Sequence, residues 1–136
     1  MATLQGALDE LITVIDAVSG VNWAPADPPG NVPVGPTAVV YASTGRLFTD
    51  TPETYRGLHN VEIALIMPEG TLPQQVQAML PLLEPVVAAI ITHRNGQTSS
   101  HYSTFSDINY VFGPINWGGQ LHTGFIFTIQ DLKIRN

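Results

Sequence analysis

The residue types that most often do chemistry in proteins are few and scattered in this sequence. The histidines include no His-x-x-x-His pair and no His-Glu-x-x-His motif, the spacings by which one helix face holds zinc; they are His59, His93, His101 and His122. No serine lies in a Gly-x-Ser-x-Gly turn, and the only adjacent acidic pair, Asp9 and Glu10, is expected on the solvent side of a helix. The pattern therefore predicts no catalytic group, no metal site and no cofactor, and hence a protein that is not an enzyme.

Two glycine-bearing stretches could in principle hold a phosphate. Residues 30–35 and 113–119 both lack the lysine and the strand-to-helix setting of a phosphate-binding loop. Cysteine is absent, which excludes disulfides and thiolate sites.

The surface is expected to carry little charge. Of the 136 residues, 44% are apolar and only 12% are charged, whereas about 25% is usual for a soluble domain. Either much of the surface is hidden against partners, which we favour, or it is covered with neutral polar side chains. The formal net charge is −6, and no Lys/Arg cluster is present, so tight binding of nucleic-acid phosphates is not expected.

The length predicts a single domain over residues 1–136. The N-terminus has no positively charged segment followed by an apolar one, so no signal peptide is expected. No run of 18 apolar residues occurs, which predicts that nothing spans a membrane.

Two helices are predicted from 3.6-residue periodicity. The first covers residues 4–19, with Thr3 as N-cap and Gly20 as the stop. The second covers residues 72–94, but Pro81 and Pro85 lie inside its pattern. Because proline removes a backbone donor and clashes with the preceding turn, this helix is expected to be kinked or broken into two.

Strands are predicted at residues 37–43, 58–67, 104–112 and 120–134, the first two as antiparallel neighbours and the last two as a hairpin. Gly113-Pro114 is expected to stop the third strand. In the last strand, Phe125, Phe127 and Ile129 should share one face, and Ile126, Leu132 and Ile134 the other. The result is an α+β domain, with a single mostly antiparallel sheet and two main helices packed on one face.

Two segments bear on partners. Residues 22–36 hold five of the eleven prolines and form either a docking arm or a connector across one end of the domain. The strand at residues 120–134 is long and uncharged until Asp131, so a bare edge there would invite pairing with another chain. We expect a sheet edge to be covered by an adjacent subunit or by residues 22–36; the alternative places this strand in the middle of the sheet.

Interface residues are predicted in two places. The stretch 44–57 carries Arg46, Phe48, Tyr55 and Arg56, and Arg and aromatic side chains are enriched in interface cores. The C-terminal stretch adds Asp131, Lys133 and Arg135. The alternative for the first stretch is a hairpin tip without a partner.

The layout of the whole chain resembles the tail terminator proteins of long-tailed bacteriophages, of the siphophage type. The shared features are the amphipathic N-terminal helix, the proline-punctuated segment ending in Pro33-Val-Gly-Pro-Thr-Ala-Val-Val-Tyr41, the strand at residues 59–66, the helix at 72–94 and a C-terminal strand pair ending at Ile129. The resemblance covers about residues 4–134 and rests on length, element order and acidic balance. Pro81 and Pro85 depart from the uninterrupted helix of that family.

The resemblance implies a ring-forming virion protein without cofactor, assembled in the host cytoplasm and located at the head-proximal end of the tail. Its partners would be itself, as a homo-hexamer, the tail tube protein and the head-closure connector protein. The ring would cap the tube, end its polymerisation and let DNA pass through its lumen. The alternatives are a neck or head-closure protein of the same kind of virion, or a monomeric small-molecule-binding α+β domain.

Overall fold

A computed structural model of the chain describes residues 3–21, 24–25, 36–47, 57–67, 79–95 and 102–134. These residues form two α-helices, one short 3-10 helix and five strands. In chain order they are α1 (Leu4–Asp16), β1 (Thr37–Arg46), β2 (Leu58–Met67), η2 (Leu80–Leu82), α3 (Leu83–Asn95), β3 (Tyr102–Thr104), β4 (Ile108–Trp117) and β5 (Gln120–Ile134).

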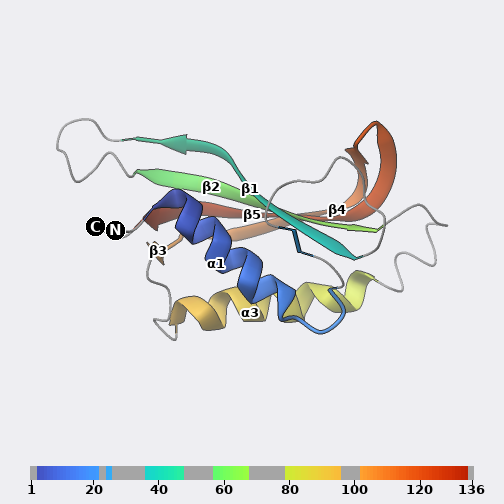
Figure 1. Cartoon of the computed structure of the whole chain (residues 1–136), viewed down its shortest axis with the longest axis horizontal. Coiled ribbons are helices and arrows are strands. Elements are labelled where there is room, and N and C mark those ends of the chain that lie inside the picture. Colours follow the sequence, from blue (N-terminus) through green and yellow to red (C-terminus); the bar gives the residue numbers. More distant parts are fainter. Residues whose placement is uncertain are drawn as a thin grey trace.

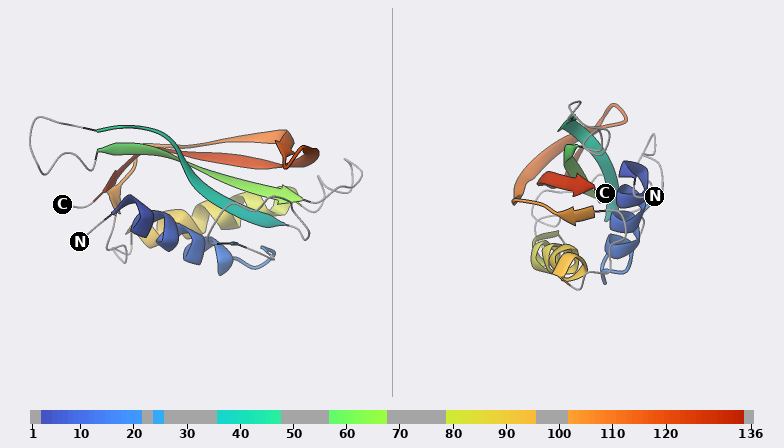
Figure 2. Two further views of the ribbon diagram at one scale, coloured as in Figure 1. Left: turned by 45° about the horizontal axis from the view of Figure 1, so that its top comes forward. Right: turned by 90° about the vertical axis from the view of Figure 1, so that its left-hand side faces the viewer.

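The strands form one antiparallel sheet with both α-helices on the same face (Figures 1 and 2). The order is β1-β2-β5, and β3 and β4 pair one after the other with the far side of β5. The predicted α+β class and the antiparallel pairing of β1 with β2 are thus confirmed. The expectation that the C-terminal strand forms an edge is wrong, because β5 pairs with β2 on one side and with β4 and β3 on the other.

The first helix begins where the sequence predicts. The Thr3 hydroxyl accepts a hydrogen bond of 3.0 Å from the Gly6 N–H, which satisfies one of the free donors of the first turn. The α-helix ends at Asp16, three residues earlier than predicted, and the chain then turns until Gly20 with φ of +102°. One stripe of α1 is fully buried: Ala7, Leu11 and Ile15.

The two prolines of the second helix have the effect that their chemistry predicts. Pro81 lies in the 3-10 helix η2, and Pro85 lies in the first turn of α3, where its missing N–H would have no intrahelical partner in any case. The predicted irregularity of the helix at Pro81 is therefore confirmed, as the 3-10 segment Leu80–Leu82. Residues 72–78 of the predicted helix lie outside the described residues.

The prediction that Gly113-Pro114 ends a strand is wrong. Strand β4 runs on to Trp117, and Pro114 pairs with Thr123 of β5. A proline is tolerated at that point because β4, among the described strands, pairs only with β5, so the nitrogen of Pro114 can point to the open side.

The predicted faces of β5 are also partly wrong. Leu132 and Ile134 lie in the same buried core as Phe125, Phe127 and Ile129. The cause is a bulge: the pairing with β2 shifts between Val61↔Ile129 and His59↔Leu132, and Asp131 adopts a left-handed φ of 56°. One extra residue reverses the alternation, so both halves of the strand face the helices.

Most of the core lies between the sheet and the helices, where α1 contacts β1 and α3. A second, smaller apolar cluster lies on the opposite face, which we call the outer face; its buried members are Val39, Ala64, Ile66 and Ile115. The end of the β4–β5 hairpin curls over this face (Figure 1) and brings Trp117 against the cluster.

Candidate interaction surfaces

Two of the predicted interface residues come together at one end of the sheet. Arg46 of β1 pairs with Leu58 of β2, and Leu58 pairs with Lys133 of β5, so the two cations lie in one cross-strand row. Both are exposed. Because neighbouring strands are about 4.8 Å apart, the two backbones are separated by roughly 10 Å. Among the described residues, the row sets two cations at one end of the sheet of a chain whose net charge is −6.

Asp131, the third described member of that set, has a structural role in the bulge. Its backbone N–H donates to Asn60 Oδ1 over 3.3 Å, and its carboxylate accepts a bond of 3.3 Å from the Ser106 hydroxyl. Its acceptance of a positive φ fits the tolerance of Asp for that region. Four of the predicted interface residues, Phe48, Tyr55, Arg56 and Arg135, lie outside the described residues, as does most of the segment 22–36.

Asn60 is the centre of a polar line that crosses the sheet. Its amide donates to Thr44 Oγ1 over 2.8 Å, and its backbone carbonyl accepts a bond of 3.2 Å from Ser43 Oγ. The register of β1 with β2 shifts at the same place, between Ala42 and Thr44. The interruption between β3 and β4 lies on the same line, where the backbone N–H of Ser106 donates to the Gln130 carbonyl over 2.9 Å. The pairing of β1 with β2, the pairing of β2 with β5 and the succession of β3 and β4 along β5 are therefore all interrupted at the same height of the sheet. Side-chain hydrogen bonds connect these irregularities.

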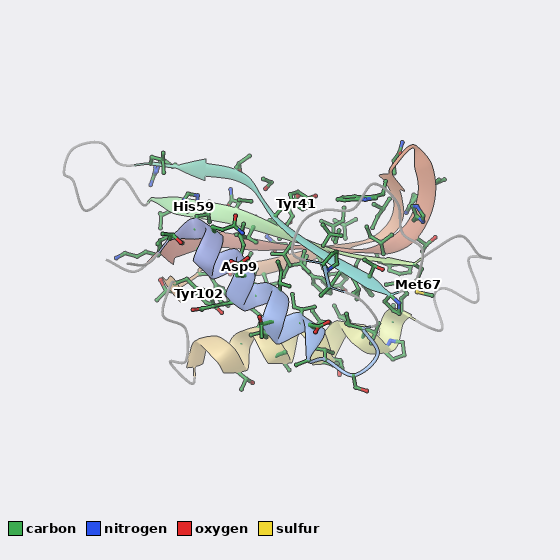
Figure 3. The ribbon with its side chains drawn as sticks, in the orientation of Figure 1. Asp9, Tyr41, His59, Met67 and Tyr102 are labelled. Carbon is green, nitrogen blue, oxygen red and sulfur yellow. The ribbon has the colours of Figure 1, made fainter. Side chains whose placement is uncertain are left out.

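Tyr41 (labelled in Figure 3) packs on the outer cluster. Its ring centroid is 6.3 Å from that of Trp117. Burial, together with a hydrogen bond to the Glu62 carboxylate and the charge of that carboxylate, raises the pKa of the Tyr41 hydroxyl to about 12. The pair fixes the neutral phenol as a donor to Glu62. It therefore serves to hold this face together.

The two histidines whose side chains are described, His59 and His122, are both buried on strands. Nδ1 of His122 lies 2.9 Å from the Met67 carbonyl oxygen, so this nitrogen carries the proton and donates. Nε2 of His122 is buried without a hydrogen-bond partner in the described part of the chain. This nitrogen can accept a hydrogen bond, but among the described residues no group of His, Asp or Glu side chains joins it to form a metal site.

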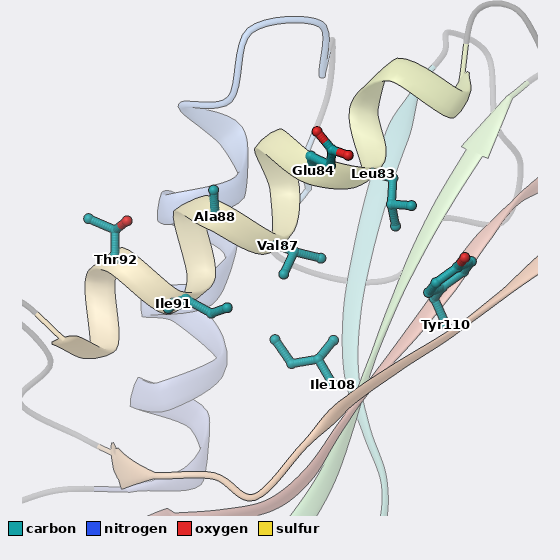
Figure 4. A pocket seen from close by; sticks show the side chains of 8 residues that line it. All are labelled: Leu83, Glu84, Val87, Ala88, Ile91, Thr92, Ile108 and Tyr110. Carbon is teal, nitrogen blue, oxygen red and sulfur yellow. The ribbon is translucent and has the colours of Figure 1, made fainter.

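An apolar groove runs between α3 and β4 (Figure 4). Leu83, Val87 and Ile91 point from the helix toward Ile108 and Tyr110 of the strand. The groove has a volume of about 580 Å³, and among the described residues that line it Glu84 is the only charged one. Tyr110 stays 55% exposed although it lies on the helix side of the sheet. The helices thus leave the β4 end of this face uncovered.

Both outer strands of the sheet are long and nearly free of charge. Strands β1 and β4 have ten residues each, and within the described sheet each pairs on one side only. Strand β4 has no charged residue, and β1 has only Arg46, at its end. The sequence interpretation missed this surface because it assigned the open edge to β5. The informative signal was Pro114, since a proline inside a strand indicates an edge.

Other classes of site find no support in the described ranges. No group of three or more histidine, aspartate or glutamate side chains there could hold a metal ion. None of the helices in these ranges is long and apolar enough to cross a membrane.

No model of a known protein family matches the chain, and no curated protein sequence is significantly similar to it.

Proposed function

We propose that the chain is a structural subunit that assembles head to tail into a ring, and that this ring is the tail terminator of a long-tailed bacteriophage. The observation that carries the proposal is the pair of unlike flanks of one sheet. Within the described residues, the β1 flank and the β4 flank are both long, open and poor in charge; α1 lies over the β1 side, whereas the β4 flank adjoins a groove.

Unlike flanks favour a head-to-tail contact over a two-fold one. In a head-to-tail contact, one surface of each copy binds a different surface of the next, and such contacts close into rings when the rotation allows. Low overall charge suits a protomer that covers both flanks in the assembly. The net charge of −6 suits a ring that DNA passes without being bound.

The assignment to the phage tail rests on the resemblance in length, element order and acidic balance. It includes the partners that the resemblance implies: the tail tube protein below the ring and the head connector above it. A neck or head-closure ring uses the same flank argument and differs only in its partners.

The groove supports one candidate from another class. A volume of about 580 Å³ lined by aliphatic side chains and Tyr110 is within the size range of small-molecule sites. In that case the protein is a monomer that binds an apolar ligand between α3 and β4.

Electron microscopy and mass photometry separate these candidates. We expect the purified protein to form rings, alone or on the ends of tail tubes assembled from tube protein, and to stop further tube growth when it is added during polymerisation. Rings that bind only the head connector would identify a neck protein. A protein that remains monomeric at high concentration and in the presence of tubes would contradict both ring proposals.

A further inference from the structure

We infer that β4 and the adjoining groove receive the β1 flank of a second copy of this chain, in one defined register that places Arg46 of one copy opposite Asp107 of the other. This contact would be the subunit interface of the proposed ring. The contact itself does not depend on the proposed function; only the closure of successive contacts into a ring does. The partner is specified by strand direction, by the faces of the sheet, by charge and by the helix layer.

The directions of the two outer strands permit this pairing. Strand β1 is antiparallel to β2, β2 to β5, and β5 to β4, so β1 and β4 run in opposite directions within one copy. A second copy placed beside β4 in the same orientation therefore offers its β1 antiparallel to β4. The sheet can continue from copy to copy without any change in its pairing type, as in strand addition.

Charge selects the register. Antiparallel addition sets the start of β4 against the end of β1. Asp107 directly precedes β4, Arg46 ends β1, and both are exposed. They are opposite in sign and lie at the meeting ends of two strands of ten residues each. Opposite charges across an interface help to fix its register.

The faces of the sheet agree with that register. Asp107 opposite Arg46 sets Asn109 opposite Thr44 and Ile108 opposite Gly45. Ile108 lines the groove on the helix side, and Gly45 pairs with His59, which is buried on that side. Thr44 bonds to Asn60, and Asn109 pairs with Thr128, both on the outer face. This agreement covers residues 44–46 and 107–109, because the bulge of β1 between Ala42 and Thr44 offsets the pairing by one residue beyond them. Within that stretch, a shift by one residue would set outer side chains against the helix side.

The helix layer supplies the apolar contact. Helix α1 contacts β1 and α3, so it lies over the β1 side of the sheet, whereas the groove leaves the β4 side open (Figure 2). An incoming β1 brings its own α1 to the open side. Besides its buried stripe, α1 carries half-buried apolar side chains that include Leu4, Leu8 and Ile12. Pro114 restricts backbone pairing near the Trp117 end of β4, so we place the shared ladder at the Ile108 end.

Disulfide cross-linking tests the register, because the chain has no cysteine of its own. Asn109→Cys protein is mixed with Thr44→Cys protein and oxidised. Directly opposed residues on antiparallel strands have Cα atoms about 4.5–5.5 Å apart, within disulfide range. We expect a covalent dimer from the mixture only. Thr13→Cys, exposed on α1, replaces either partner as the control and should give none.

A pair of matched lysine variants tests the surface without cysteines. Val111 on β4 is 69% exposed and Leu121 near the start of β5 is 68% exposed, so both tolerate lysine in the monomer. We expect Val111→Lys to raise the dissociation constant of self-association about tenfold, because a charge blunts an edge strand. Leu121→Lys should leave it unchanged. Sedimentation velocity measures both.

Three results would overturn the inference: no cross-link in the Asn109→Cys and Thr44→Cys mixture, an equal cross-link from Asn109→Cys protein alone, which indicates two-fold β4–β4 pairing, or equal effects of the two lysine variants. Rings that cap tubes without this cross-link would contradict the inference and leave the proposed function standing. If the cross-link forms but the protein never caps tubes, the inference stands and the proposed function is contradicted.

Discussion

Gly124 is the residue at which one methyl group should have the largest effect. It lies in β5 opposite Ile66 of β2 and Gly113 of β4. A β-carbon at position 124 would overlap the Leu65 carbonyl oxygen and lie 3.1 Å from Ile115 Cδ1. Because the first obstacle is backbone, no side-chain rotation can relieve it, and β2 and β5 must move apart.

The magnitude follows from the cost of overpacking. Inserting a methyl group into a tightly packed site typically costs about 1–3 kcal/mol. For a chain of this size, each kcal/mol corresponds to about 3–5 °C in Tm. We therefore expect Gly124→Ala to lower Tm by roughly 3–15 °C, with a matching loss of unfolding free energy in urea.

Gly113 provides the matched control, since it is the cross-strand partner of Gly124 and a β-carbon there meets nothing within 4 Å. Gly113→Ala reduces the freedom of the unfolded chain without a clash and should stabilise the protein by about 0.4–1 kcal/mol. Equal unfolding free energies for the two variants would refute the reasoning, because they would show that β2 and β5 are not in close approach at Leu65.

Three further predictions concern the core, the outer face and the polar line. Leu11→Ala should cost about 2–5 kcal/mol in urea unfolding, because Leu11 is fully buried; a loss below about 1 kcal/mol would mean that this face of α1 is open before assembly. Because its pKa is raised, the contribution of Tyr41 to stability is complete below about pH 10 and is lost as the pH rises toward about 12. The tyrosinate absorbance of the parent protein minus that of Tyr41→Phe should therefore have its midpoint near pH 12. A midpoint near pH 10 would contradict the burial of Tyr41 and its bond to Glu62. Asn60→Ala removes the side-chain bonds to Thr44 and to the Asp131 backbone and should cost about 1–2 kcal/mol in urea unfolding; an unchanged free energy would show that the bulges are held by the backbone alone.

Local patterns predicted the elements whose signals are local. The start of α1 follows from Thr3 and the apolar stripe, and β2 has the predicted bounds because alternation and its flanking breakers agree. The break at Pro81 follows from the chemistry of proline. These are properties of a few neighbouring residues.

What could not be predicted depends on neighbours distant in the sequence. The central position of β5 depends on which strands pair with it, and strand length alone suits an edge or a centre equally. The continuation of β4 through Pro114 depends on one side of that strand being open. The bulge at Asp131 is supported by Asn60, about seventy residues away, so no window around Asp131 could reveal it.

Sequence reasoning named residues of the candidate surface but not their arrangement. Arg46 and Lys133 were chosen from separate stretches and lie in one row, and their place in an interface stays a prediction. Asp131 stabilises a bulge. The groove and the β4 edge were missed. The groove exists because the helix layer does not cover the β4 side of the sheet, and this offset depends on tertiary packing that no local pattern reveals.

The bulge at Asp131 has a consequence for insertions and deletions in the gene. Loss of one codon at position 130 or 131 would remove the extra residue and set Leu132 two positions after Ile129, so plain alternation would still turn Leu132 and Ile134 toward the helices. Such a deletion would remove the bulge, together with the bond between Asn60 and the backbone of residue 131, and would leave the core facing as it is. Sequence drift in this part of the chain can therefore include the loss of one residue between Ile129 and Leu132 as well as substitutions.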